Sequence, residues 1–526
     1  RVLFRSVVVL LVYAGLMGVT YWGFARMPTG FIPEQDKGYV LVNVQMPEAT
    51  SVQRTHEVVR RLDEIARGID GVGHTLGVSG MSLLLQANAP NFGSMFVLLK
   101  PFDQRRDPRQ SDRAIAAQLR RKCYLAFPEA VVGVFGAPPV DGLGTAGGFK
   151  LIVEDRQDLG TKALQAATDG LLERANHQPG LAGCFTLFKS NTPQLYVDID
   201  RKKVKVLGVS TSGVFDALQV YMGSLYVNNF NQFGRSWQVK LQADGTYRNE
   251  ARDVAQLKVR NRRGQMVPLG TLAEIRDVEG PVMVTRYNMY AAAPVNGNMA
   301  PGTSSGDAIR LMQSLADDVL PKSMTAEWTE LTLMQKLAGN TSMYVFTLAV
   351  VLVFLVLAAQ YESWSLPLAV ILVVPMCLLS SIAGVALAGK DMNIFTQIGF
   401  VVLVGLASKN AILIVEFARQ QRQAGMGRRE ATVEACRLRL RPIIMTSLAF
   451  ILGVVPLVVA HGAGAEMRRS LGTAVFSGML GVTLFGILLT PVFFYVLDWL
   501  VGRSKDAFPV EPSGNSTSPL ADNARL

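Results

Sequence analysis

The chain has 526 residues, of which 49% are hydrophobic and 18% are charged, with a formal net charge of +11 and a mean hydropathy of +0.26. Soluble domains carry roughly 25% charged residues. These figures exclude a single soluble globule, and they also exclude a disordered, collagen-like or coiled-coil chain. Residues from about 26 to 340 nevertheless read as ordinary soluble sequence, so the apolar excess lies outside them.

The first apolar stretch, Val7–Phe24, is long enough to cross a hydrocarbon core of about 30 Å. A cleavable signal peptide is the alternative, but no small-x-small cleavage site follows the stretch. We therefore predict a membrane helix at about 5–27, followed by a connector at 28–37. Five further spans are predicted within 341–502, at about Met343–Ala359, Pro367–Ala388, Ile394–Phe417, Pro442–Ala460 and Leu471–Leu500.

Lysine and arginine residues in the short loops indicate the orientation of these spans. The connection after the fourth span is strongly basic, with Arg419, Arg422, Arg428, Arg429, Arg437, Arg439 and Arg441. The turns on the other side carry only Lys390, Arg468 and Arg469. The sequence therefore predicts that both termini lie in the cytoplasm and the large soluble segment outside it. Because topology explains the basic balance and no aromatic-interleaved basic groove is visible, we expect no nucleic acid partner.

The extramembrane region repeats a strand-then-helix pattern. Residues 40–46 alternate between apolar and polar side chains, and apolar residues at helical spacing follow them over 58–65. The pattern returns at 149–153 with 163–172, and at Val282 and Val284 with 309–315. These units predict split βαβ subdomains, each with helices on one face of an antiparallel-type sheet. A more polar stretch at about 192–275 predicts a distinct subdomain.

No pattern in the extramembrane region indicates an enzyme, a cofactor or a metal site. The four histidines are isolated, and there is no phosphate-binding glycine loop, nucleophile elbow or metalloprotease helix. Cys123 and Cys184 could form a disulfide only if the fold brings them together, and unpaired buried thiols are the simpler expectation. We predict no catalytic residues, no metal and no cofactor.

Lys409 lies about fifteen residues into the span that begins near Ile394, which places it near the bilayer midplane. A lysine at this depth should pair with an acid or line a hydrated path, and Asn410 adds a second polar group. The acids within the spans, which are Glu362, Glu416 and Asp498, all lie near span ends. The sequence therefore predicts that the partner of Lys409 comes from outside this chain.

Arg439 and Thr446 are seven residues apart, so both can face one side of the span that begins near Pro442. Arg439 alone could be one more cytoplasmic positive charge, and Thr446 alone could bond back to its own helix. Together with Lys409 they predict a polar file from the cytoplasm to the midplane, as a proton relay requires.

Four sequence runs carry a resemblance to a known family: GLASKNAILIVEFA at 405–418, RLRLRPIIMTS at 437–447, YESWS at 361–365 and TPQ at 192–194. They resemble the resistance–nodulation–division (RND) permeases of the hydrophobe/amphiphile branch, which are proton-driven multidrug efflux pumps of Gram-negative bacteria. The resemblance extends from about residue 5 to residue 503. The tail at 503–526 is unmatched, rich in Ser, Pro and Asn, and predicted to be disordered and cytoplasmic.

A complete permease of this family has twelve spans and two outer loops, and this chain resembles its C-terminal half. The resemblance implies an α+β membrane protein with six transmembrane helices and a large periplasmic domain. It places one porter subdomain at 38–142, a second at 148–189 with 283–330, and a docking or funnel subdomain at 192–275.

The resemblance also implies the assembly in which the chain acts. The family works as a homotrimer in the inner membrane, joined to a periplasmic membrane-fusion adaptor and an outer-membrane channel. It exports lipophilic small molecules and is driven by the proton-motive force, without a cofactor. A half-length chain is therefore expected to be inactive without the N-terminal half.

Residue by residue, Lys409 matches the family lysine that pairs with two membrane aspartates of the N-terminal half. Arg439 and Thr446 match its partners on the next span, and Asn410 is adjacent. The resemblance also predicts a substrate pocket from Leu76, Val78, Gly80, Met81, Leu83, Phe96 and Phe135. Well-known drug pumps have phenylalanines at several points where this chain has leucine or methionine, so substrates that rely on aromatic stacking are not expected.

Two alternatives remain open at this point. A related metal-ion exporter would show paired methionines in the outer cleft, and Met81 and Met95 form no clear cluster. A membrane-anchored scaffold without transport activity is the other alternative.

Overall fold

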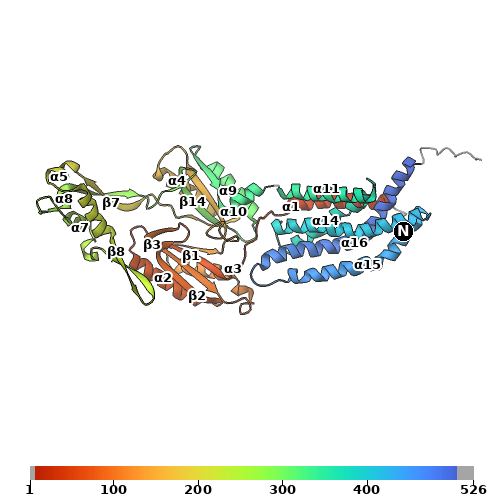
Figure 1. Cartoon of the computed structure of the whole chain (residues 1–526), viewed down its shortest axis with the longest axis horizontal. Coiled ribbons are helices and arrows are strands. Elements are labelled where there is room, and N and C mark those ends of the chain that lie inside the picture. The colour runs from red at the N-terminus through yellow and green to blue at the C-terminus, as the bar shows by residue number, and fades with distance from the viewer. Residues whose placement is uncertain (1–5, 340, 506–526) are drawn as a thin grey trace, which may run out of the picture.

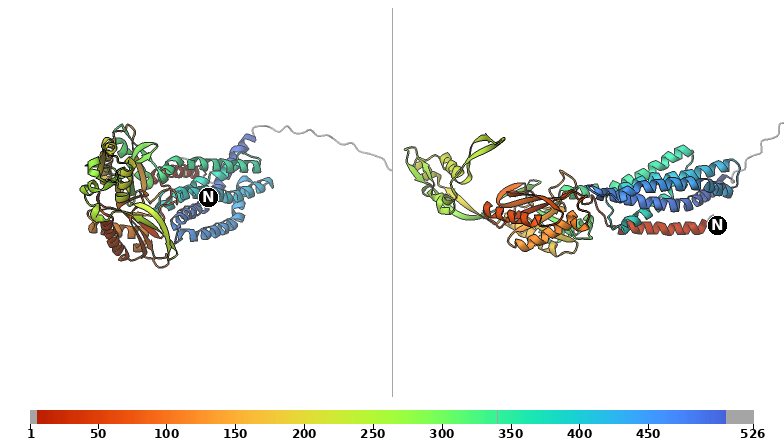
Figure 2. Two further views of the ribbon diagram at one scale, coloured as in Figure 1. Left: turned by 60° about the vertical axis from the view of Figure 1, so that its left-hand side comes forward. Right: turned by 90° about the horizontal axis from the view of Figure 1, so that it is seen from below.

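The computed structural model describes residues 6–339 and 341–505, so the predicted tail beyond residue 505 lies outside the described residues. The molecule is elongated (Figures 1 and 2). A bundle of long helices forms one end, two sheet-containing units lie in the middle, and a smaller mixed unit forms the opposite end. The chain is thus a mixed helix and strand protein with several apolar helices, as predicted.

The first sheet unit is an antiparallel four-stranded sheet with helices on one face. The sheet order is β2-β3-β1-β4. Its elements are β1 (Tyr39–Gln45), α2 (Val52–Arg67), β2 (Val72–Ser82), β3 (Ala87–Leu99), α3 (Asp112–Ala126) and β4 (Val131–Gly136). Because side chains alternate along β1, Val40, Val42 and Val44 all point toward the helices. They pack there in a core that includes Leu62 of α2 and Leu119 of α3. On the opposite face, Leu41, Asn43 and Gln45 of β1 are buried as well, so other parts of the chain cover the sheet there.

The second sheet unit combines two separate parts of the chain. Its path of strands is β13-β14-β5-β15, and β6 also pairs with β14. Its elements are β5 (Phe149–Asp155), α4 (Thr161–His177), β6 (Leu181–Thr186), β13 (Thr285–Tyr287), β14 (Tyr290–Met299), α9 (Ser305–Val319) and β15 (Met324–Trp328). The predicted strand at Val282 and Val284 is wrong, because strand pairing begins only at Thr285. Pro281 precedes these residues, and both valines are exposed.

The third unit lies farthest from the helix bundle (Figure 1). Two antiparallel strands, β7 (Thr192–Ile199) and β12 (Ala273–Gly280), lead into it and out of it. Its remaining elements are α5 (Arg201–Val206), α6 (Thr211–Leu218), η3 (Gln219–Gly223), β8 (Leu225–Gln232), β9 (Arg235–Leu241), η4 (Gly245–Tyr247), α7 (Ala251–Gln256), β10 (Lys258–Arg260), β11 (Met266–Pro268) and α8 (Leu269–Leu272). Every residue of the β8–β9 hairpin is exposed.

Six segments of the described chain are helical, long and apolar enough to cross a membrane, which confirms the six predicted spans in number. The helices of the bundle are α1 (Ser6–Arg26), α11 (Thr341–Tyr361), α12 (Leu366–Ile371), α13 (Val374–Leu387), α14 (Ile394–Gln423), α15 (Arg428–Val458) and α16 (Ala465–Lys505), with α10 (Glu330–Ala338) preceding α11. The third span is interrupted between α12 and α13, just before Pro375, which cannot donate a backbone hydrogen bond.

Two helices extend well beyond the predicted spans. α14 ends at Gln423 and α15 already begins at Arg428, so only residues 424–427 connect them. All seven arginines assigned to the connection therefore lie on helices. Backbone hydrogen bonding continues through the charged sequence at the membrane boundary, although hydropathy does not.

The bundle packs unevenly. α16 contacts α13, α14 and α15, and small residues allow the α13–α16 approach: a Cβ on Gly384 would lie 2.2 Å from the Cβ of Ser477. α1 and α11 bury almost none of their apolar side chains within the chain. Figure 2 shows α1 at one side of the bundle. A large apolar surface of the described helices is therefore left uncovered by the chain itself.

Candidate functional site

Lys409 lies on the uncovered side of α14. The exposed residues of this helix include Ile398, Val402, Gly405 and Lys409, whose spacing of four, three and four residues forms one stripe. Among the described residues, Lys409 forms no hydrogen bond and no ion pair. Its ammonium group thus stands at the end of an otherwise apolar stripe, with no counter-charge from the part of the chain that the structure describes.

Asn410 faces the opposite way, toward α15. Its Nδ2 donates to Oγ of Ser447 at 3.0 Å, and both residues are buried. Sequence reasoning did not single out Ser447, although it stands in the quoted run beside Thr446. Thr446 donates to the carbonyl of Ile443 in its own helix at 3.1 Å, the local bond that was its alternative interpretation.

Arg439 contacts α14 about two helical turns beyond Lys409, toward the end of the bundle that faces away from the sheets. The carbon Cζ of its guanidinium lies 3.8 Å from the ring centroid of Phe417. Its Nε is buried and has no hydrogen-bond partner. No hydrogen bond or ion pair among the described residues joins Arg439 to Lys409 or Thr446, so the predicted polar file is not a continuous chain of contacts here.

The acids near the span ends are occupied elsewhere or distant. Asp498 accepts from Arg428 at 2.7 Å and lies 3.4 Å from Arg422. Glu416 accepts from Gln420 at 3.1 Å. Neither carboxylate pairs with Lys409.

Three of the predicted pocket residues, Leu76, Phe96 and Phe135, lie on the face of the first sheet opposite its helices. The strand register places Leu76, Phe96, Leu41 and Phe135 in one row across β2, β3, β1 and β4. Leu76 is exposed and Phe96 half-buried. Phe135 is buried against Leu187 of the second unit, with its ring centroid 5.5 Å from that of Phe185. The row is thus open at one end and covered at the other.

The segment after Leu76 bends back over this face. Gly80 has a φ of +85°, a backbone conformation that suits glycine, and it coincides with a register shift between β2 and β3. Beyond it, Oγ of Ser82 donates to Oδ1 of Asn43 at 2.8 Å, and Oγ of Ser94 donates to the carbonyl of Met81 at 2.9 Å. The three side chains are buried, so this polar cluster holds the segment down. Val78, Met81 and Leu83 are each half-buried.

A cavity between the two sheet units adds residues that sequence reasoning missed. Gln45, Glu48 and Phe92 line it from the first unit. Its walls on the second side include Leu187, Phe188, Lys189, Thr285 and Pro294. Gln45 is buried and its Oε1 has no hydrogen-bond partner. The alternation in β1 places Gln45 on the face opposite the helices, which was the available signal.

The connector at 28–37 ties the bundle to both sheet units. The amide of Met392, in the α13–α14 turn, donates to the carbonyl of Pro28 at 2.9 Å, and the amide of Gly306 donates to that of Thr29 at 3.0 Å. Nε2 of Gln35 donates to Sδ of Met467 at 3.3 Å, which links the connector to α16. The connector is therefore in direct contact with both the bundle and the second sheet unit.

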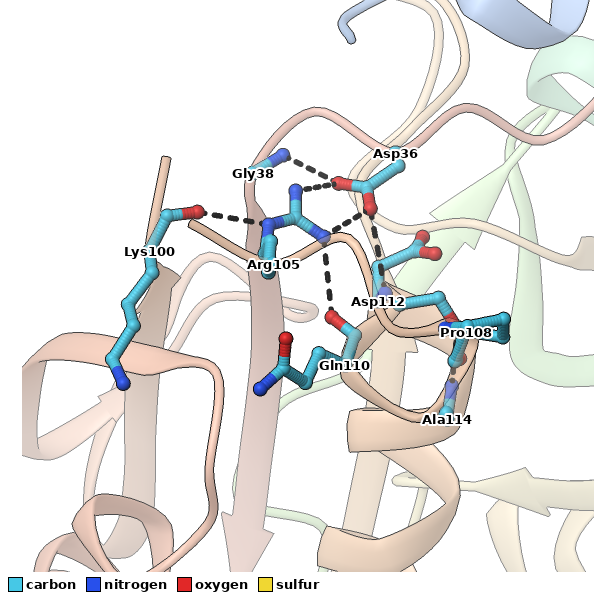
Figure 3. A network of polar contacts seen from close by, with 9 residues as sticks. Asp36, Gly38, Lys100, Arg105, Pro108, Gln110, Asp112 and Ala114 are labelled. Carbon is cyan, nitrogen blue, oxygen red and sulfur yellow. Dashed lines mark hydrogen bonds and ion pairs between the residues drawn. The ribbon is translucent and has the colours of Figure 1, made fainter. Parts of the chain in front are cut away.

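A buried ion pair anchors the end of this connector (Figure 3). The guanidinium of Arg105 donates to both carboxylate oxygens of Asp36, with Nη2 2.7 Å from Oδ1. Burial would raise the pKa of Asp36, but hydrogen bonds from Arg105 and from the amide of Gly38 outweigh it, and the pKa is lowered. Burial, and then the negative charge of Asp36, raise the pKa of nearby Asp112 to about 6.

The cysteines do not form a disulfide. Cys123 lies in the core of the first sheet unit and Cys184 in that of the second, and both thiols are free. Burial raises the pKa of Cys123 to about 12 and that of Cys184 to about 11. Within the described residues, no group of three or more His, Cys, Asp or Glu side chains could hold a metal ion.

The fold and the site define a multi-pass membrane protein with a large helix and strand region beyond the helix bundle. A family model described as the AcrB/AcrD/AcrF family matches residues 1–498. The chain therefore belongs to this family, which confirms the resemblance to RND permeases of the hydrophobe/amphiphile branch.

Curated relatives agree with this assignment. The chain is 36% identical over 516 residues to the multidrug/solvent efflux pump membrane transporter MepB of Pseudomonas putida, an alignment that covers 97% of this chain and 49% of the relative. It is 37% identical over 493 residues to the multidrug export protein AcrF of Escherichia coli K12, covering 93% and 47%. Against the multidrug resistance protein MdtF of the same strain it is 36% identical over 505 residues, covering 95% and 48%. The chain thus spans about half the length of these relatives.

Proposed function

We propose that this chain is the C-terminal half of a proton-driven exporter of drugs and other lipophilic compounds, inactive without the N-terminal half. In this proposal the permease lies in the inner membrane of a Gram-negative cell, with the sheet units in the periplasm. The names of the relatives, which are multidrug and solvent efflux transporters, support export of such compounds.

The observation that carries the proposal is Lys409. A charged side chain at the bilayer centre costs about 3 kcal/mol or more when it faces lipid. Lys409 stands on an uncovered stripe with no counter-charge among the described residues. Two aspartates of the N-terminal half would neutralise it, and protonation of one of them would release it. Arg439, Thr446 and Asn410 complete the proposed relay.

In this proposal the three extramembrane units form the substrate-binding and docking parts of the exporter. The first and second sheet units are the porter subdomains, and the unit farthest from the membrane is the docking subdomain. Substrate binds on the face of the first sheet opposite its helices, along the row of Leu76, Phe96 and Phe135, and beside Val78, Gly80, Met81 and Leu83. The connector contacts support transmission of helix movements to this face. The assembly is a homotrimer joined to a periplasmic adaptor and an outer-membrane channel.

A metal-ion exporter has less support. Met95 is fully buried in the core between the first sheet and its helices, to which Met81 does not contribute. Their side chains cannot line one cleft together. A scaffold without transport activity remains the competing function, and the experiment below separates it.

The test uses an efflux-deficient bacterial host and a lipophilic fluorescent dye. We expect the chain alone to leave dye accumulation unchanged, and co-expression with the N-terminal half encoded by its own permease gene to restore energy-dependent efflux. Lys409→Ala should abolish that efflux while membrane abundance persists. Lys390→Ala, a lysine in the α13–α14 turn outside the spans, serves as the matched control and should retain it.

Two results would contradict the proposal. Efflux retained by Lys409→Ala would remove the relay role of the lysine. No efflux by any combination of folded halves, with stable co-assembly, would favour the scaffold.

A further inference from the structure

The guanidinium of Arg439 stacks on the ring of Phe417 and donates no hydrogen bond to any described residue. Its Cζ stands 3.8 Å from the centroid of Phe417, which is contact distance for a stacked pair. The neighbouring contact of Arg419 with Tyr361 is much looser, at 5.9 Å. Arg439 forms no hydrogen bond or ion pair within the described residues, and its Nε is buried. Its charge is therefore positioned without being neutralised.

The stack lies on the same seam as the Asn410–Ser447 hydrogen bond. On α14, Phe417 follows Asn410 by seven residues, which keeps both on one face. On α15, Arg439 precedes Ser447 by eight residues, and the two helices are antiparallel neighbours. The two contacts thus tie α14 to α15 at levels about 11 Å apart along the helix axes.

Phe417 has a property that a carboxylate in its place would lack. The ring face attracts a cation through its quadrupole and accepts none of the five N–H groups in a directed bond. Glu416, the adjacent acid, accepts from Gln420 instead of from Arg439. The positive charge and the N–H donors of Arg439 consequently remain available to a partner that binds transiently.

We propose that Phe417 is a positioning residue for the proton relay. By stacking against Arg439, it keeps the positive charge on the α14–α15 seam, two turns from Lys409, and prevents the long side chain from turning outward toward the interface. The inference rests on the relay role proposed for Arg439. It extends that role by assigning the orientation of the arginine to an aromatic side chain on the neighbouring helix.

The experiment measures initial efflux rate against external pH in cells that carry both halves. Phe417→Leu keeps an apolar side chain and removes the ring face. Because a nearby positive charge opposes proton binding, its displacement should raise the pH of half-maximal efflux by about half a unit or more. The maximal rate should fall by about three- to tenfold. Phe417→Tyr and Phe417→Trp retain a ring and should restore the wild-type profile.

Phe400→Leu is the matched control. Phe400 lies on the same helix and contacts the ring of Phe24 at 5.7 Å, with no cation–ring contact in the described chain. Its loss should leave the pH profile unchanged at equal membrane abundance. A wild-type profile in folded Phe417→Leu would overturn the proposal, and so would equal damage by Phe417→Leu and Phe417→Tyr.

Arg439→Ala, assayed in parallel, separates this proposal from the one on which it rests. If Arg439→Ala abolishes efflux and Phe417→Leu matches the wild type, only the role of Phe417 fails. If Arg439→Ala retains the wild-type rate and pH profile, the relay role of Arg439 fails and the positioning role fails with it.

Discussion

At the scale of single residues, the Asp36–Arg105 pair is the most strongly buried ion pair of the sheet units. Asp36→Asn would leave the guanidinium buried with half of its hydrogen bonds and no counter-charge. We expect the variant to lose about 3 kcal/mol of stability in the first sheet unit, since removal of one partner of a buried pair costs far more than the net worth of the pair. Thermal unfolding of the purified chain, followed by circular dichroism, measures this loss.

Asp141→Asn is the control for that measurement. Asp141 pairs with Lys37 at 2.7 Å, but its side chain is 84% exposed. Solvent screens such a pair, so the stability should change by less than about 1 kcal/mol. Equal effects of the two substitutions would show that burial does not decide the value of the Asp36 contact.

Asp112 predicts a pH dependence with a definite sign. Its pKa in the folded chain, about 6, lies above its ordinary value because of burial and the charge of Asp36. The stabilising contribution is therefore fully present below about pH 4 and is lost as the pH rises through 6. Besides Asp36, the charged groups that act on it are Arg113 and Glu466.

Asp112→Asn cannot ionise, so it should be more stable than the wild type at pH 7.5 and close to it at pH 4.5. The measurement is the melting temperature of both proteins across this range. The exposed Asp103, substituted by Asn, should leave the pH dependence unchanged. A variant that is less stable than the wild type at pH 7.5 would contradict the assignment.

At the scale of elements, the β8–β9 hairpin is a projection without a core. All of its residues are exposed, and Nε1 of Trp237 donates only to the carbonyl of Gln232 within the hairpin. Replacement of residues 226–240 by a short Gly-Ser turn should therefore change the melting temperature of the chain by no more than about 2 °C, since almost no apolar burial is lost.

Leu269→Ala provides the contrast within the same unit. Leu269 is fully buried in the small core of the third unit, so its truncation should cost about 3 kcal/mol. If removal of the hairpin unfolds the unit as severely as Leu269→Ala does, the hairpin has a structural role that its exposure does not indicate.

Elements also show where prediction from sequence fails for a physical reason. Hydropathy located the six spans, but it ended the fourth at Phe417 and began the fifth at Pro442, whereas the helices continue to Gln423 and start at Arg428. At Val282 and Val284 an alternating pattern exists without a strand, because no neighbouring strand pairs with these residues. The periodicity of apolar residues indicates which face of a segment could be buried. Pairing with a neighbouring strand decides whether that segment forms a strand at all.

At the scale of the whole molecule, the uncovered surface of α1, α11 and α14 predicts mutual stabilisation of the two proposed halves. We expect the chain to co-purify with the N-terminal half and to melt at a higher temperature in the complex than alone, because binding to the folded state stabilises it. Size-exclusion chromatography in detergent, followed by thermal unfolding, measures both. A melting temperature that is unchanged by the other half, without co-purification, would contradict the proposal.

In the candidate site, too, some features follow from the sequence and others depend on how the helices and strands pack. The depth of Lys409 and its lack of an acid at the same level follow from position and composition along one helix, so the sequence was sufficient for both. Ser447 and Phe417 were missed because their roles depend on which face of α14 meets α15. The pocket residues were individually predicted from the resemblance, but the common row of Leu76, Phe96 and Phe135 depends on strand register.

Apolar runs along the sequence were therefore sufficient to predict the number of spans and the separation of membrane and extramembrane sequence. Both are properties of local composition, since transfer of each segment from water to lipid depends on its own side chains. Tertiary structure alone decided which of those side chains remain uncovered, with Lys409 on an open stripe and Arg439 stacked on Phe417. Such contacts join residues far apart in the chain, and they are set by helix packing and strand register rather than by local sequence.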